Sequence, residues 1–107
     1  MKNGKIRDTQ LATLIAEELD FVLSSAQDSR LAELTITGVE PKAGAGHFII
    51  YVAPNDDSQS FASATEVKAI LQRASGFLRY ELSSLLNLKR MPELSFMPDP
   101  LYPWGVK

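Results

Sequence analysis

The stretch LQRASGFLRYELSSLLNLKRMPELSF, residues 71–96, decides how this chain folds. Its apolar residues keep the three-and-four spacing of one helical face and continue a pattern that begins at Phe61. A single helix over residues 60–88 would be about 43 Å long, which is more than a compact domain of this size can cover. A glycine in a helix interior costs about 1 kcal/mol relative to alanine, and a serine hydroxyl can cap a new helix. We therefore predict two helices that meet at a bend at Ser75 and Gly76, with one straight helix as the alternative.

The residues before this stretch predict a helix followed by a β-hairpin. Residues 10–23 place their apolar side chains on one helical face, and Asp8 or Thr9 is suited to cap its start. The segment LTITGVE, residues 34–40, alternates as a strand does, and HFIIYVA, residues 47–53, is apolar throughout. The PKAGAG between them is rich in turn-forming residues, so we expect two antiparallel strands.

A second helical region and a third strand complete the predicted order. Ser58 or Ser60 is a candidate cap for the helix that runs to the bend. After the bend and the second helix, Leu94 and Phe96 alternate with polar residues in a short strand that begins near Pro92. The order helix, strand, strand, helix, bend, helix, strand predicts an α+β domain with a three-stranded sheet and helices on one face. The third strand returns after a helical crossover, so we expect a mixed sheet.

The end of the chain and its composition limit the architecture further. We expect one domain over residues 1–97 and a proline-rich tail, PDPLYPWGVK, over residues 98–107, with Trp104 folded back onto the domain. The chain of 107 residues has no cysteine and no apolar run of the length that crosses a membrane. We therefore expect a cytoplasmic protein without a membrane partner.

Side chains suited to catalysis or metal binding are scarce in the sequence. His47 has no cysteine or second histidine to share a metal with, and we expect it to be an exposed turn residue. Asp56 and Asp57 stand in a loop before a helix, where acids favour the positive end of the helix dipole. The segment AGAGH, residues 43–47, lacks the lysine and hydroxyl of a phosphate-binding loop, and Ser75 lacks the context of a nucleophile elbow. We predict that the chain is not an enzyme and uses no metal or cofactor.

Charge is separated along the chain, although the net charge is only -2. Residues 11–40 sum to -5, whereas residues 61–90 sum to +3. A helix start at the bend would expose backbone N–H groups that bind phosphate, and Gly76 would let a sugar-phosphate chain come close. A basic face that is simply solvated is the alternative. On the first interpretation the predicted RNA-binding residues are Lys5, Arg7, Arg73, Gly76, Arg79, Lys89 and Arg90.

Four pieces of the sequence occur together in the order seen in one bacterial family. They are DSRL at 28–31, LTITGVE at 34–40, YV at 51–52 and the long stretch at 71–96. In these pieces the chain resembles ribosome-binding factor A, an assembly factor of the small ribosomal subunit. The resemblance implies a type II KH-like fold with an Ala-x-Gly bend, here Ala74, Ser75 and Gly76, and it adds Ala74 and Ser75 to the RNA-binding residues. It also implies a non-catalytic protein, monomeric in isolation, that binds the 30S subunit near the 3′ end of 16S rRNA and assists rRNA processing and late maturation.

The acidic first helix supports a second hypothesis from a different class. Glu17, Glu18 and Asp20 would lie on the polar face of that helix and could bind a basic partner. The chain would then be a protein-interaction module that keeps a KH-like fold and no longer binds RNA.

Overall fold

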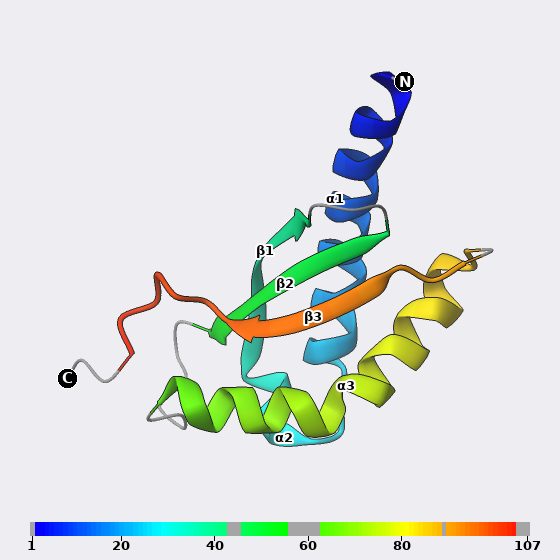
Figure 1. The fold of residues 1–107 in the computed structure, drawn as a ribbon. Helices are drawn as coiled ribbons and strands as arrows, with labels where there is room; N and C mark the ends of the chain where they lie inside the picture. Colours follow the sequence, from blue (N-terminus) through cyan, green and yellow to red (C-terminus); the bar gives the residue numbers. More distant parts are fainter. Residues whose placement is uncertain (1, 43–45, 56–62, 89, 105–107) are drawn as a thin grey trace.

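The computed structural model describes residues 2–42, 46–55, 63–88 and 90–104 of the chain. Helices and strands follow one another as in Figure 1, and this order confirms the predicted α+β class. The short helix α2 is not among the predicted elements; Asp28 caps it by accepting a hydrogen bond from the Arg30 amide. The elements are α1 (Lys2–Ser24), α2 (Ser29–Ala32), β1 (Leu34–Pro41), β2 (His47–Pro54), α3 (Ala64–Leu86) and β3 (Glu93–Pro98).

The sheet has the order β1-β2-β3, so the second strand lies in the centre. β1 and β2 pair antiparallel and β2 and β3 pair parallel, which confirms the predicted mixed sheet. The β1–β2 register shifts between Ile36 and Gly38, which leaves Thr37 as the extra residue of a bulge.

The two faces of the sheet differ in burial. Along β2, Phe48, Ile50 and Val52 are buried, whereas His47, Ile49 and Tyr51 are only half-buried. Because side chains alternate across a strand, the first set faces the helices and the second set faces the open side. α1 passes behind the sheet in Figure 1, in agreement with the prediction of helices on one face. The core also takes residues from both long helices, among them Ile15, Leu19, Leu71, Leu78 and Leu82.

α3 is one continuous helix whose axis changes direction near its middle, as Figure 1 shows between its green and yellow halves. The bend is therefore present, but the helix does not break there. The prediction that a new helix start exposes backbone N–H groups at the bend is wrong. The Ser75 hydroxyl donates to the Gln72 carbonyl oxygen at 3.1 Å, so it does not cap a new helix as we expected. Hydroxyls that bond back in this way often bend a helix, and a glycine beside a serine is a common kink site.

The ends of the two long helices also differ from the prediction. Ser63 caps α3 by accepting a hydrogen bond from the Glu66 amide at 3.2 Å, while the two serines predicted for this role, Ser58 and Ser60, lie outside the described residues. α1 begins at Lys2, so Asp8 and Thr9 lie inside the helix and not at its cap. Among the α1 side chains that the structure describes, those that pack in the core begin at Leu11, where the apolar rhythm of the sequence also starts.

Asp20 has a structural role that the sequence did not indicate. Its carboxylate accepts hydrogen bonds from the Thr35 hydroxyl at 3.0 Å and from the Ile36 amide at 2.8 Å. α1 is thereby tied to β1 next to the bulge. Asp20 is therefore engaged within the fold, which weakens the hypothesis that it binds a partner together with Glu17 and Glu18.

The residues after β3 fold back onto the domain. The Asp99 amide donates to the Val52 carbonyl oxygen at 2.8 Å, which continues the β2–β3 pairing by one bond. The Trp104 indole N–H donates to the Asp99 carbonyl oxygen at 2.6 Å, and its ring lies 4.6 Å from that of Tyr102. Trp104 packs against the core, as expected from the sequence. The domain boundary at residue 97 stays a prediction.

Candidate nucleic-acid interface

The outer surface of α3 carries the predicted bend residues. Ala74 and Ser75 are half-buried, whereas Gly76 is exposed. A Cβ built on Gly76 would meet no atom within 4 Å, so the surface above this residue is open. This openness agrees with the close approach of a sugar-phosphate chain that we predicted, although it does not show such an approach.

A shallow depression of about 160 Å³ lies between α3 and β3. Leu71, Leu94 and Phe96 form its apolar part, and Gln72 and Arg79 supply polar groups. The Arg79 guanidinium donates to the Leu94 carbonyl oxygen at 2.9 Å and so ties the helix to the strand. A guanidinium has five N–H donors, so this bond leaves further donors of Arg79 for a phosphate.

Helical spacing extends the polar residues of this depression toward the start of α3. Lys68, Gln72, Ser75 and Arg79 follow one another at intervals of four, three and four residues along α3. Lys68, Gln72 and Arg79 are exposed. Sequence reasoning missed Gln72 and did not place Lys68 in the site, although the spacing alone could have found both.

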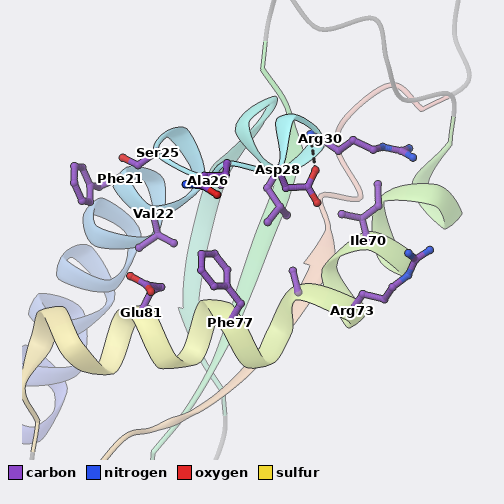
Figure 2. Close-up of a pocket in the computed structure, with 13 residues that line it drawn as sticks. Phe21, Val22, Ser25, Ala26, Asp28, Arg30, Ile70, Arg73, Phe77 and Glu81 are labelled. Atoms are coloured by element: carbon purple, nitrogen blue, oxygen red, sulfur yellow. Dashed lines mark hydrogen bonds between the residues drawn. The ribbon is translucent and has the colours of Figure 1, made fainter.

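Arg73 lies on the other side of α3. It lines a larger groove, of about 630 Å³, between this helix, the end of α1 and α2 (Figure 2). Arg73 and Arg79 therefore lie on either side of Gly76, as predicted, but they line different hollows.

The other basic residues predicted to bind RNA differ in their position relative to the bend. Arg90 is exposed shortly after α3, and Lys89 lies outside the described residues. Lys5 and Arg7 belong to the first turns of α1, and their side chains are not described. Arg7 precedes Phe21, which borders the groove of Arg73, by 14 residues, or about 21 Å of helix. The structure therefore does not bring Lys5 and Arg7 to the bend.

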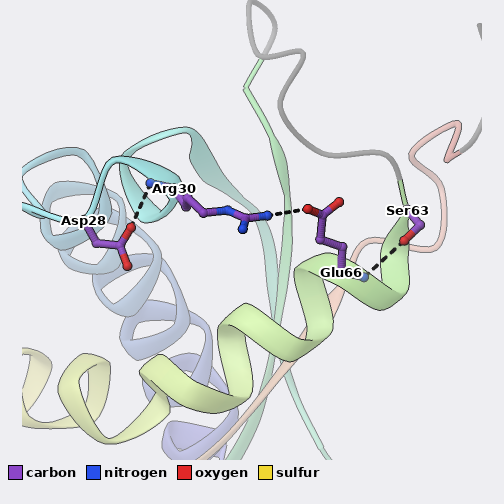
Figure 3. Close-up of polar contacts among 4 residues, drawn as sticks. All are labelled: Asp28, Arg30, Ser63 and Glu66. Carbon is purple, nitrogen blue, oxygen red and sulfur yellow. Dashed lines mark hydrogen bonds and ion pairs between the residues drawn. The ribbon is translucent and has the colours of Figure 1, made fainter.

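Polar contacts hold α2 against the start of α3 (Figure 3). Arg30 on α2 forms an ion pair with Glu66 in the first turn of α3. The Glu66 amide donates to the Ser63 cap, and the Asp28 carboxylate accepts from the Arg30 amide. The ion pair links α2 to α3 beside the groove that Arg73 lines, while the other two bonds cap the starts of these helices.

The open face of the sheet has acidic and neutral polar side chains. The Tyr51 hydroxyl donates to the Glu40 carboxylate at 3.1 Å, and this bond is the main reason why the pKa of Tyr51 lies above its usual value of 10.0. His47 is not the exposed turn residue that we expected, because its side chain is 24% exposed and its Nε2 lies 2.8 Å from the Ser95 hydroxyl. Glu93 lies nearby, with a carboxylate oxygen 3.9 Å from His47 Nδ1. Carboxylates on this face disfavour phosphate, which favours α3 as the RNA-binding surface.

Two further findings concern the described part of the chain. No group of three or more histidine or acidic side chains there is arranged to hold a metal ion. No helix there is both long and apolar enough to cross a membrane.

Comparison with known proteins identifies the family. The family model of ribosome-binding factor A matches residues 7–103. Ribosome-binding factor A of Limosilactobacillus reuteri is 32% identical over 108 residues, which cover 100% of this chain and 89% of that protein. The protein of the same name from Pediococcus pentosaceus is 35% identical over 102 residues, with 94% of this chain and 86% of that protein covered.

Solved structures share the fold. The crystal structure of ribosome-binding factor A from Thermus thermophilus aligns with a TM-score of 0.69 at 22% identity, over 90% of this chain and 99% of that one. A homology model of Thermus thermophilus ribosome-binding factor A, fitted into a cryo-EM map of a 30S complex with that protein, aligns with a TM-score of 0.63 at 22% identity, over 85% of this chain and 93% of that one. Together with the match over residues 7–103, which confirms the resemblance seen in the sequence, these findings show that the chain belongs to the ribosome-binding factor A family.

Proposed function

We propose that this protein binds the small (30S) ribosomal subunit near the 3′ end of its 16S rRNA and assists rRNA processing and late maturation of the subunit. The observation that carries the proposal is the family match, which spans nearly the whole chain. The homology model of the Thermus thermophilus relative, fitted into the cryo-EM map of a 30S complex, supports the choice of partner. On this proposal the protein acts by binding and not by catalysis, as a monomer, in the cytoplasm.

The RNA contact that we propose uses side chains and not helix amides. Because α3 is continuous, its backbone N–H groups at Gly76 do not form a new helix start, and the attraction for phosphate must come from basic side chains. Lys68 and Arg79 offer charge on the side of Gly76 that faces β3, and Arg73 offers it on the other side. Arg90 extends the charge beyond the end of the helix. Ala74 and Ser75 shape the bend and do not carry charge themselves.

Salt dependence and charge reversal test this surface together. Each phosphate contact adds about -0.7 to -0.9 to the slope of log affinity against log salt concentration. We expect the double variant Arg73→Glu and Arg90→Glu to bind 30S subunits more weakly in a sedimentation assay and to show a shallower salt slope. Arg79 is left unchanged, because its bond to Leu94 would make a loss of stability hard to separate from a loss of binding. Lys42→Glu, one charge reversal of the same kind at an exposed residue outside α3, is the control for each single variant and for the double one.

The result distinguishes this proposal from the protein-interaction hypothesis. If the double variant and the control sediment with 30S subunits as the unchanged protein does, these arginines are not the contact. If the unchanged protein keeps its partners after nuclease treatment of a cell extract and never sediments with 30S subunits, the protein-interaction hypothesis replaces the proposal. The circular dichroism melting curve of each variant shows whether the fold is intact.

A further inference from the structure

The groove between α1, α2 and α3 has an apolar lining that the proposed RNA contact does not use. Phe77 rises from α3 into the groove, opposite Val22 and Ala26, and Phe21 stands at one end (Figure 2). Phe21 is 58% exposed and Phe77 is 44% exposed. Two exposed phenylalanine rings on the border of one hollow are typical of a surface that binds an apolar group.

The charge around the two rings is negative at the end that Phe21 occupies. Glu17 and Glu18 precede Phe21 by one helical turn, and Glu81 follows Phe77 by one turn and lines the groove. α1 ends beside the groove without a basic residue in its last turn, so the partial negative charge of its C-terminus is not offset there.

The positive charge of the groove lies at its other end. Arg30 and Arg73 stand there, as Figure 2 shows, and Arg30 is engaged with Glu66. Asp28 also lines the groove at this end, so its carboxylate offsets the charge of Arg73. The groove is therefore apolar in the middle, acidic near Phe21 and Glu81, and close to neutral near Arg73. A bound segment would meet a different charge at each end, which would fix its direction.

We propose that this groove docks a cationic amphipathic segment of another protein. Apolar side chains of the segment insert between Phe21 and Phe77, and its lysine or arginine side chains lie against Glu81, Glu17 and Glu18. RNA is the poorer occupant, because its phosphates would meet these carboxylates. A second copy of the chain is also poorer, because it would bring a second lining with an excess of carboxylates against this one.

The two surfaces open on different sides of α3, so both partners can bind at once. The proposed RNA contact uses Lys68 and Arg79 next to β3 and the exposed surface at Gly76. The groove opens toward α1 and α2. Arg73 borders both and is left unchanged in the test. This inference goes beyond the proposed function, and it stands or falls independently of 30S binding.

The test uses a fluorescein-labelled helical peptide built from leucine and lysine, with a leucine-glutamate peptide of the same spacing as its counterpart. We expect the cationic peptide to bind the full chain in a fluorescence polarisation assay, and the acidic peptide to bind at least 10-fold more weakly. Phe21→Ser and Phe77→Ser should each weaken binding by on the order of 10-fold to 30-fold. Glu81→Lys should weaken it and also reduce its dependence on salt. Tyr80→Ser is the matched control, because Tyr80 is an exposed aromatic residue of α3 that does not line the groove.

Four results would overturn the inference. The first is the absence of peptide binding at about millimolar concentration, and the second is equal binding of the acidic peptide. The third is a loss of affinity in Tyr80→Ser that matches the loss in Phe77→Ser. The fourth is displacement of the peptide by an RNA oligonucleotide or by self-association of the chain, since either would make a different molecule the occupant. Thermal melting of each serine variant shows that the fold is kept, and 30S sedimentation of Phe21→Ser should be unchanged.

Discussion

A substitution at Gly76 should affect the stability of the fold and the binding of 30S subunits in opposite directions. Gly76 lies inside α3, its φ is not in the left-handed region, and a Cβ there would meet no atom within 4 Å. Replacing a helical glycine by alanine under these conditions stabilises a protein by about 0.5–1 kcal/mol, since alanine loses less backbone freedom on folding. For 107 residues, an unfolding entropy of about 2.1 cal/mol/K per residue makes 1 kcal/mol equal to about 4 °C. We therefore expect Gly76→Ala to raise the melting temperature by about 2–4 °C.

The same substitution should weaken binding to 30S subunits, if the open surface at Gly76 admits a sugar-phosphate chain. The measurements are a calorimetric melt and sedimentation with 30S subunits, on the same preparation. Ser84→Ala is the control, because Ser84 is an exposed residue of the same helix that lies away from the bend. A melting temperature that falls in Gly76→Ala would refute the reasoning, since it would mean that the bend needs glycine. Unchanged 30S affinity would show that Gly76 is not a point of close approach.

Three further changes test contacts elsewhere in the fold. Asp20→Ala should lower the free energy of unfolding by about 1.5–3 kcal/mol in urea titrations, because the Ile36 amide loses a charged acceptor; an unchanged midpoint would contradict this role. Gly46→Ala should cost about 1–2 kcal/mol by the same measurement, because φ is 77° at this residue; a neutral effect would mean that the turn readjusts freely. The hydrogen bond to Glu40 raises the pKa of Tyr51, so this bond should contribute its full stabilisation below pH 10 and lose it as the pH rises further. Tyr51→Phe should therefore make the loss of stability at alkaline pH smaller. An alkaline melting profile identical to that of the unchanged protein would argue against the bond.

Local patterns predicted most of the fold. The hairpin was placed to within a residue because alternation in LTITGVE and the apolar run HFIIYVA are short-range signals, and β1 and β2 occupy Leu34–Pro41 and His47–Pro54. The start of α1 was missed because its first turns carry few apolar residues, so apolar periodicity does not mark them. α2 was missed because a helix of 4 residues is too short for any periodic signal.

The position of the bend in α3 was predicted correctly, but the predicted break of the helix was wrong. Length and the pair of Ser75 and Gly76 located the change of direction, but composition cannot say whether a helix breaks or merely curves. That choice depends on whether the Ser75 hydroxyl bonds forward to an amide or back to the Gln72 carbonyl, and it bonds back. The predicted amide contribution to RNA binding was lost with it.

The candidate site was predictable in its charge and not in its geometry. A cluster of cations in the last third of the chain is visible in the sequence, but the helical rotation that puts Arg73 and Arg79 on opposite flanks depends on which face of α3 enters the core. The bond from Arg79 to Leu94 and the engagement of Asp20 are tertiary contacts that no local pattern encodes.

The place of β3 in the sheet affects how a newly made chain reaches its final form. β2 is central, but the strand that covers its second edge is the last one synthesised, some 40 residues later. Until Glu93 and the residues after it emerge, β2 presents a row of unsatisfied backbone donors and acceptors beside the apolar side chains of Phe48 and Ile50. Such an edge pairs readily with other chains. A protein truncated before β3 should therefore aggregate during translation instead of accumulating as a soluble intermediate.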